Sequence, residues 1–189
     1  EGSVPLQRIL KVQGSLEIAA GGPGENPPIR LEGDIEIANG NLDIQGGFSW
    51  LSESLEVSGD AGVDSEDGID RGVLTIRGPD DPGQTFQSSF DRSGTQTLDA
   101  RVIAIERGVV IEKHEGSLDM IASNVDFDTL IDDPTATIDV DGVIRLAPDP
   151  EAVPGEEAAD QGRALEILAG GAVTLGDSAH LVADRITIV

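Results

Sequence analysis

The sequence of 189 residues contains no cysteine and no tyrosine, and aromatic residues make up only 3% of it. Without cysteine, the chain forms neither a disulfide framework nor a cysteine-ligated metal site. No apolar run approaches the roughly 18 residues that a membrane-spanning helix requires. The chain is therefore not a disulfide-stabilised small domain, and we predict no transmembrane segment in it.

Basic side chains are also scarce, because 12 Lys and Arg stand against 36 Asp and Glu, which gives a formal net charge of −24. A protein that binds nucleic acid needs a basic stripe to face the phosphates. We therefore exclude nucleic acid as a partner. Hydrophobic residues still make up 38% of the chain, which is enough for a folded core and too much for a disordered acidic tail.

Short runs that alternate apolar and polar residues dominate the chain, and Gly, Asn, Asp and Pro separate them. Runs in which a glycine precedes two apolar residues, spaced two apart, occupy residues 14–18, 33–37, 40–44, 72–76, 116–120, 142–146 and 171–175. No segment sustains the 3.6-residue period of a helix. We therefore predict an all-β chain.

The spacing of these runs indicates how the strands are arranged. Leu16, Ile35, Leu55 and Leu74 follow one another at intervals of 19, 20 and 19 residues. Such a period predicts a β-solenoid, in which about 20 residues form each coil and roughly nine coils fit the chain, less its loops. Ile35 and Leu55 then face the interior. An antiparallel β-sandwich or jelly roll, whose strands also recur regularly, is the alternative.

The polar residues between these apolar positions face solvent in the same register. Asp34 is one of them, and Glu17, Glu36 and Glu56 would lie above one another, with Thr75 next. Like charges on neighbouring strands repel each other. We therefore expect this column to need screening by salt or by divalent cations.

Three segments resemble loops, at residues 20–28, 78–97 and 147–162. The last contains three prolines and five carboxylates, a composition typical of an insertion or linker. We divide the chain into a solenoid-like body over residues 1–146, an acidic, proline-rich loop or linker over 147–162, and C-terminal strands over 163–189 that continue the body.

Asp64, Glu66, Asp67 and Asp70 place four carboxylates within seven residues around a glycine. Hard cations such as Ca²⁺ prefer oxygen ligands of this kind. The spacing differs from that of an EF-hand loop, and a solvated acidic turn is the alternative. These four residues are the candidate metal site, and Ca²⁺ is the candidate ion.

Other chemistry has little support. His114 and His180 have no histidine four residues away and no nearby cysteine, so we expect no zinc site. Paired carboxylates occur throughout the chain and single out no catalytic pair. Trp50 is the only tryptophan, so the aromatic platforms of sugar-binding clefts are missing. We predict that the chain is not an enzyme.

The C-terminal residues 165–188 run through a strand, an Ala-Gly-Gly turn at 169–171, a Val-Thr-Leu strand at 173–175 and further short strands of small residues. This segment resembles the repeats of filamentous-haemagglutinin-type adhesins, and residues 16–22 are similar to its first half. The resemblance implies a right-handed parallel β-helix that a partner transporter exports to the cell surface, with an adhesive or scaffold function.

These observations predict a non-enzymatic structural or adhesive segment of an exported bacterial surface protein, located outside the cell or at its surface. Two alternatives remain open. The chain is a self-assembling lattice or filament subunit joined through its strand edges, or an acidic module that binds cations. The expected partners are other protein chains, including further copies of this one.

Overall fold

The computed structural model describes residues 9–13, 16–19, 29–38, 40–58, 71–123, 134–148 and 162–189. These residues form 19 strands and no helix. Accordingly, no helix among them is long and apolar enough to cross a membrane.

The strands lie in three sheets, which we call A, B and C. Sheet A contains β1 (Ile9–Gln13), β4 (Asp34–Ala38), β7 (Ser54–Ser58), β10 (Thr95–Ala100), β13 (Ser117–Ala122), β16 (Ala164–Ala169) and β19 (Arg185–Ile188). Sheet B contains β2 (Leu16–Ala19), β5 (Leu42–Gln45), β8 (Val73–Arg77), β11 (Val102–Ile105), β14 (Thr137–Val140) and β17 (Val173–Leu175). Sheet C contains β3 (Ile29–Leu31), β6 (Phe48–Trp50), β9 (Phe86–Phe90), β12 (Val109–Lys113), β15 (Val143–Leu146) and β18 (His180–Val182).

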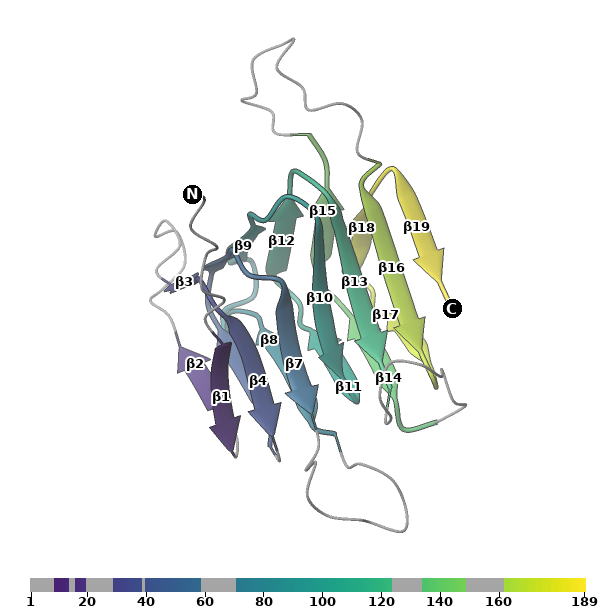
Figure 1. Ribbon diagram of the computed structural model, residues 1–189. Helices are drawn as coiled ribbons and strands as arrows, with labels where there is room; N and C mark the ends of the chain where they lie inside the picture. The colour runs from purple at the N-terminus through teal and green to yellow at the C-terminus, as the bar shows by residue number, and fades with distance from the viewer. Residues whose placement is uncertain are drawn as a thin grey trace, which may run out of the picture.

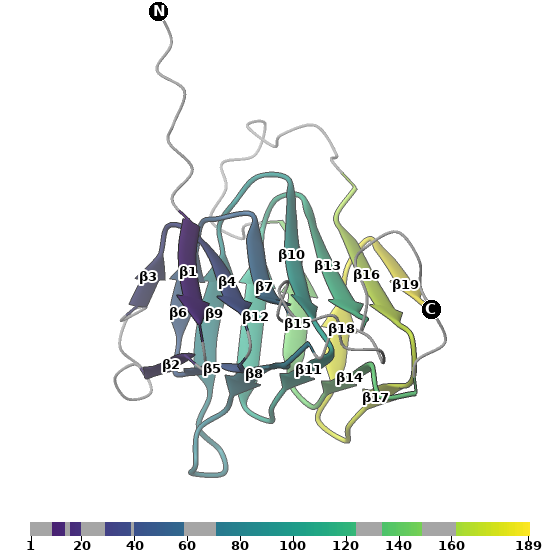
Figure 2. The ribbon, with the colours of Figure 1, turned by 60° about the horizontal axis from the view of Figure 1, so that its bottom comes forward.

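The chain winds through sheets A, B and C in turn, so that each coil adds one strand to each sheet. All pairs of neighbouring strands in these sheets are parallel. Figure 1 shows the strands of sheet A side by side from β1 to β19, and Figure 2 shows sheet B across the bottom of the view. The predicted β-solenoid is confirmed as a parallel β-helix, and the antiparallel sandwich is excluded.

The number of coils is smaller than the sequence predicted. Leu55 lies 20 positions after its partner Ile35, and Met120 lies 22 positions after its partner Leu98. By contrast, Leu98 lies 43 positions after Leu55 because insertions lengthen that coil. The 19 strands therefore make six complete coils and the first strand of a seventh. At about 4.8 Å per layer, β1 and β19 lie roughly 29 Å apart along the axis.

The spacing of 19 to 20 residues that predicted the solenoid corresponds only in part to the length of a coil. Ile35 stacks on Leu55 in sheet A, as predicted. Leu16 and Leu74, however, lie in sheet B, on either side of Leu42. Their assignment to the Ile35 column was wrong because all three strands of a coil carry similar alternating runs. An interval of 19 residues can therefore connect two different sheets.

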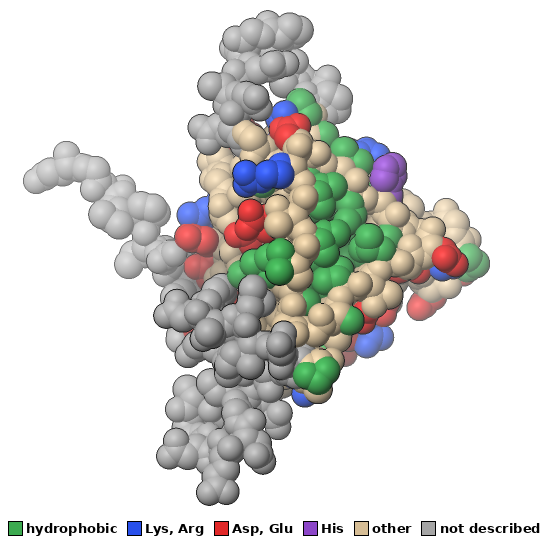
Figure 3. Space-filling view, turned by 90° about the vertical axis from the view of Figure 1, so that its right-hand side faces the viewer, with side chains coloured by type: hydrophobic (Ala, Val, Ile, Leu, Met, Phe, Trp, Pro, Cys, Tyr) green, Lys and Arg blue, Asp and Glu red, His purple; other side chains and the backbone are tan. Residues whose placement is uncertain are grey.

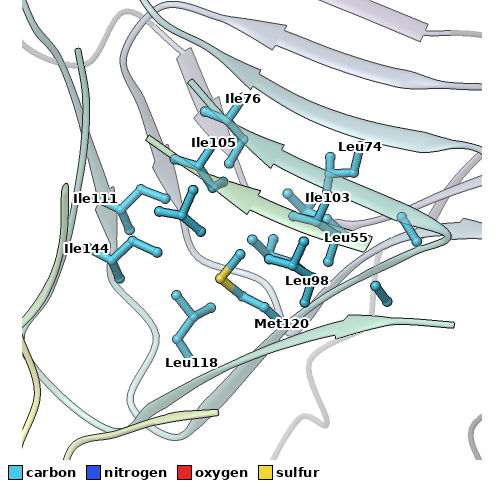
Figure 4. Packing of buried hydrophobic residues seen from close by; sticks show 14 of the residues in the cluster. Leu55, Leu74, Ile76, Leu98, Ile103, Ile105, Ile111, Leu118, Met120 and Ile144 are labelled. Carbon is cyan, nitrogen blue, oxygen red and sulfur yellow. The ribbon is translucent and has the colours of Figure 1, made fainter. Parts of the chain in front are cut away.

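Apolar side chains fill the space enclosed by the three sheets. One column of sheet A runs through Ile35, Leu55, Leu98, Met120 and Ile167, all of which are buried. Figure 4 shows Leu98 and Met120 of this column pointing toward side chains of sheets B and C. In sheet C, Trp50 packs edge-on against Phe90 with ring centroids 4.7 Å apart. The coils thus share one continuous hydrophobic core.

Glycines allow the coils to stack closely where the chain passes from sheet C to sheet A. Gly94 and Gly116 both have positive φ angles, of 112° and 75°. A Cβ atom on Gly116 would lie 2.1 Å from the carbonyl oxygen of Gly94 in the coil before it. Any other residue at position 116 would therefore force these two turns apart.

Asp34 differs from its expected solvent exposure, because only 9% of its surface is accessible. Its Oδ1 accepts hydrogen bonds from the backbone N–H groups of Glu53 (2.8 Å) and Ser54 (3.1 Å) in the next coil. The side chain does lie on the outer face, but the corner of the neighbouring coil covers it. Asp34 is therefore a structural link between two coils.

Replacing Asp34 with alanine is expected to lower the free energy of unfolding by about 1–2 kcal/mol, because two N–H groups lose their acceptor. Asp34→Asn keeps an oxygen at this position and should lose clearly less. Urea denaturation of both variants measures the difference. Equal losses would show that the two hydrogen bonds do not stabilise the corner.

Candidate functional site

The predicted calcium site, formed by Asp64, Glu66, Asp67 and Asp70, lies outside the described residues. Within the described ranges, no group of three or more His, Asp or Glu side chains is arranged to hold a metal ion. Calcium binding by residues 64–70 stays a prediction.

The sequence predicted that Glu17, Glu36, Glu56 and Thr75 are successive neighbours in one sheet. Of these three predicted pairs, one is correct and two are wrong. Glu36 and Glu56 are neighbours in sheet A, as expected. Glu17 and Thr75 belong to sheet B, where they lie on either side of Asp43. The cause is the same similarity between strands that misplaced Leu16 and Leu74.

Arg71 places a positive charge beside Glu56 and Asp99 in sheet A, where the sequence led us to expect screening by salt or divalent cations. Asp99 follows Glu56 in sheet A, and Arg71 lies across both, 3.8 Å from the Glu56 carboxylate. Both terminal nitrogens of the Arg71 guanidinium donate to Asp99, one at 2.9 Å, and it also bonds Ser123. Arg71 is 4% exposed and Asp99 is 1% exposed. These contacts link Arg71, which precedes β8, to Asp99 in β10 and to Ser123, which follows β13, on the outer face of sheet A.

A second pair of carboxylates lies farther along sheet A, where Asp119 neighbours Glu166. Burial, followed by the charge of Glu166, raises the pKa of Asp119. Arg185 approaches Glu166 to 3.6 Å. Arginines therefore offset acidic neighbours at two places on the sheet.

A polar network crosses the interior at the corner between sheets C and A. Lys113 is fully buried, and its Nζ donates to Arg92 O (2.6 Å) and to Gln96 Oε1 (2.8 Å). Gln96 Nε2 in turn donates to the carbonyl oxygens of Trp50 (3.1 Å) and Ser52 (2.9 Å). Burial lowers the pKa of Lys113 to about 8. The network connects three successive coils.

An open groove of about 350 Å³ lies over the outer face of β11, β14 and β17. At its rim, Arg107 Nε donates to Asp141 Oδ2 at 3.0 Å. The backbone N–H of Ser178 donates to Asp141 Oδ1 at 2.8 Å. The hydrogen bond from Ser178, with a smaller contribution from Arg107, lowers the pKa of Asp141. These rim groups bind one another and thereby link successive coils.

Large exposed hydrophobic side chains occur only at the two ends of the described solenoid. They are Leu10 at 52% exposure in β1, and Leu175 (48%), Ile186 (40%), Ile188 (45%) and Val189 (65%) at the other end. Ile188 ends the interior column that includes Ile167, and Leu175 ends the column that includes Val140. Figure 3 shows hydrophobic side chains gathered at the centre of this C-terminal end. An exposed hydrophobic patch of this kind is typical of an interaction site.

The strand edges at both ends add to this surface. Among the described strands, β17, β18 and β19 each have a neighbour on one side only, and so do β1, β2 and β3. The outer edge of such a strand presents N–H and C=O groups that can pair with a further strand. The C-terminal end, formed by β17, β18, β19 and Val189, is therefore the candidate interaction surface.

Sequence reasoning missed most of these features. The alternation through β12 places Lys113 on the inner face with Val109 and Ile111, so its burial was readable. The burial of Asp99 depends on Arg71, 28 residues earlier, and no local pattern indicates it. Likewise, the alternation places Ile186 and Ile188 at inward positions, but it does not show which strand would cover them.

Comparison of the chain with protein-family models, with curated proteins and with solved structures finds no match in any of the three.

Proposed function

We propose that the chain is a non-enzymatic structural or adhesive segment of an exported bacterial surface protein, and that it acts as a stacked rod. The observation that supports this role is the continuous register of the interior columns. One column passes from Leu10 in β1 to Ile188 in β19 through every strand of sheet A. Each coil is stabilised by the coils on either side of it, as in other repeat proteins.

The shape of the rod suits a spacer. β1 and β19 lie at opposite ends of the coil stack (Figure 1). Structures that adjoin these two strands would be held roughly 29 Å apart by stacked layers about 4.8 Å thick. The surface location is supported by the resemblance of residues 165–188 to exported adhesin repeats.

A rod that works through its shape should tolerate the loss of one whole coil. Deletion of residues 117–163 joins Gly116 to Ala164 and removes β13, β14 and β15. Because Leu118 pairs with Leu165, β16 then takes the place of β13 on β10. We expect this variant to unfold cooperatively and to be displayed on intact cells like the complete protein.

The matched control removes a similar length out of phase. Deletion of residues 137–182 leaves two sheet A strands, β13 and β19, next to each other in the chain, so we expect β19 to lose its place in the stack and the variant to unfold at a lower temperature than the in-phase deletion. The measurements are thermal unfolding of the purified proteins and antibody labelling of intact and permeabilised cells of the encoding bacterium. Labelling only after permeabilisation would contradict the surface location, and failure of the 117–163 deletion to fold would contradict the modular rod.

A further inference from the structure

We propose that Asp119 and Glu166 share one proton and so form an acid-dependent link between two coils. The protonated carboxyl group of Asp119 donates a hydrogen bond to the Glu166 carboxylate. Both residues lie on the outer face of sheet A, in the neighbouring strands β13 and β16 (Figure 1). When the proton is lost, two like charges face each other and the link becomes a repulsion. This device belongs to the coil stack itself and does not depend on the location of the chain.

The register of sheet A places the two carboxyl groups side by side. Asp119 is paired with Glu166 in the parallel ladder, and neighbouring parallel strands lie about 4.8 Å apart. Along the chain, however, the two strands are separated by a whole coil, which includes β14 and β15. A hydrogen bond between these two carboxyl groups therefore joins successive coils directly.

Asp119 differs from the other shielded aspartates because its carboxylate has no donor. It is half-buried, and within the part of the chain that the structure describes no hydrogen bond or ion pair involves it. The other described aspartates that are buried or half-buried each accept a hydrogen bond or an ion pair, namely Asp34, Asp43, Asp99 and Asp141. A shielded carboxylate without a donor binds a proton more readily than a solvated one. The structure thus leaves Asp119 in the state that the link requires.

The surroundings assign the proton to Asp119 and the negative charge to Glu166. Arg185 lies 3.6 Å from the Glu166 carboxylate and so favours its ionised form. On the other side of β13, the neighbour of Asp119 is the uncharged Thr97, and Asp99, farther along β10, is already bound by an arginine. Burial, followed by the charge of Glu166, raises the pKa of Asp119. The two carboxyl groups therefore differ, and the shared proton belongs mainly to Asp119.

The link stabilises the stack in acid. Because the pKa of Asp119 lies above its ordinary value of 3.8, the folded chain holds a proton that the unfolded chain has released. Unfolding then releases a proton and becomes easier as the pH rises. The stabilisation is complete below pH 3.8 and is lost as the pH rises through the raised pKa. Asp141, whose pKa is lowered, acts in the opposite direction, but its stabilising effect is lost only as the pH falls below 3.8.

Urea denaturation at several pH values between about 4 and 7 tests the link. Asp119→Asn keeps the shape of the side chain and offers an N–H donor to Glu166 at every pH. We therefore expect a higher urea midpoint than that of the wild type at pH 7, and a difference that disappears toward pH 4. Asp139→Asn is the matched control, because Asp139 is exposed and its strand neighbours are Ala104 and Thr174. Its effect should be the same at both pH values. An equally constant effect of Asp119→Asn, or a lower midpoint at pH 7, would overturn the proposal.

NMR titration of the side-chain carboxyl carbons measures the sharing itself and needs no folded Asp119→Asn variant. In the wild-type protein, we expect the Asp119 signal to titrate with a pKa above 3.8. In Glu166→Gln, whose amide carries no charge, this pKa should move toward its ordinary value. A wild-type Asp119 signal that titrates at or below pH 3.8 would contradict the link. A raised pKa that Glu166→Gln leaves unchanged would show that burial alone holds the proton, and would likewise overturn the proposal.

Discussion

Replacing Asp99 with alanine is expected to lower the free energy of unfolding by about 3–5 kcal/mol, because it leaves a buried cation with only the Glu56 carboxylate, 3.8 Å away. The Arg71 guanidinium is 4% exposed and donates to both carboxylate oxygens of Asp99. Its burial limits the access of water that could replace the lost partner. Urea denaturation of the variant and the wild type measures the effect.

Two further variants separate this explanation from a general sensitivity to lost charge. Glu112→Ala removes the partner of Arg145 in an exposed ion pair with 48% and 32% of the two side chains accessible, and should cost less than about 1 kcal/mol. Arg71→Met/Asp99→Leu removes both buried charges and should recover most of the lost stability. If Asp99→Ala were as mild as Glu112→Ala, the buried pair would not stabilise sheet A.

Raising the pH from about 8 to about 10.5 is expected to increase the free energy of unfolding by about 3 kcal/mol, because Lys113 loses its buried charge. Burial lowers the pKa of this side chain from 10.5 to about 8 in the folded protein. Between these values the unfolded chain keeps the proton and the folded chain releases it, so unfolding takes up a proton and becomes harder as the pH rises. Below pH 8 both states are protonated and this contribution is constant.

The chain contains no tyrosine and no cysteine, so neither of these residue types contributes to a change of stability in this alkaline range. The charges of Asp91, Arg92 and Glu115 also act on Lys113, with smaller effects than burial. Urea denaturation at several pH values in this range should show the rise in the wild type and its loss in Lys113→Met. The same rise in both proteins would assign it to another group.

The period-two alternation was sufficient to predict the fold class and the inner position of Ile35 and Leu55. It was insufficient to assign strands to sheets, because Leu16 in sheet B and Ile35 in sheet A occupy the same kind of run. Coil length was hidden as well, because Leu55 and its neighbour Leu98 are separated by two insertions.

The candidate interaction surface depended on information that a local pattern does not contain. Ile186 is apolar and lies at an inward position, like its neighbour Leu165, yet one is 40% exposed and the other is fully buried. The difference arises because a further layer covers β16 and none of the described strands covers β19. Exposure at the end of a solenoid therefore follows from the stacking order, which only the three-dimensional structure supplies.

X-ray crystallography of the wild-type protein tests the central claim most directly, namely that the chain is a parallel stack of coils. Because sheet A holds seven strands in the order β1 to β19, we predict parallel pairing throughout this sheet and a separation of roughly 29 Å between β1 and β19 along the axis. Antiparallel pairing between successive strands of the chain would contradict the account.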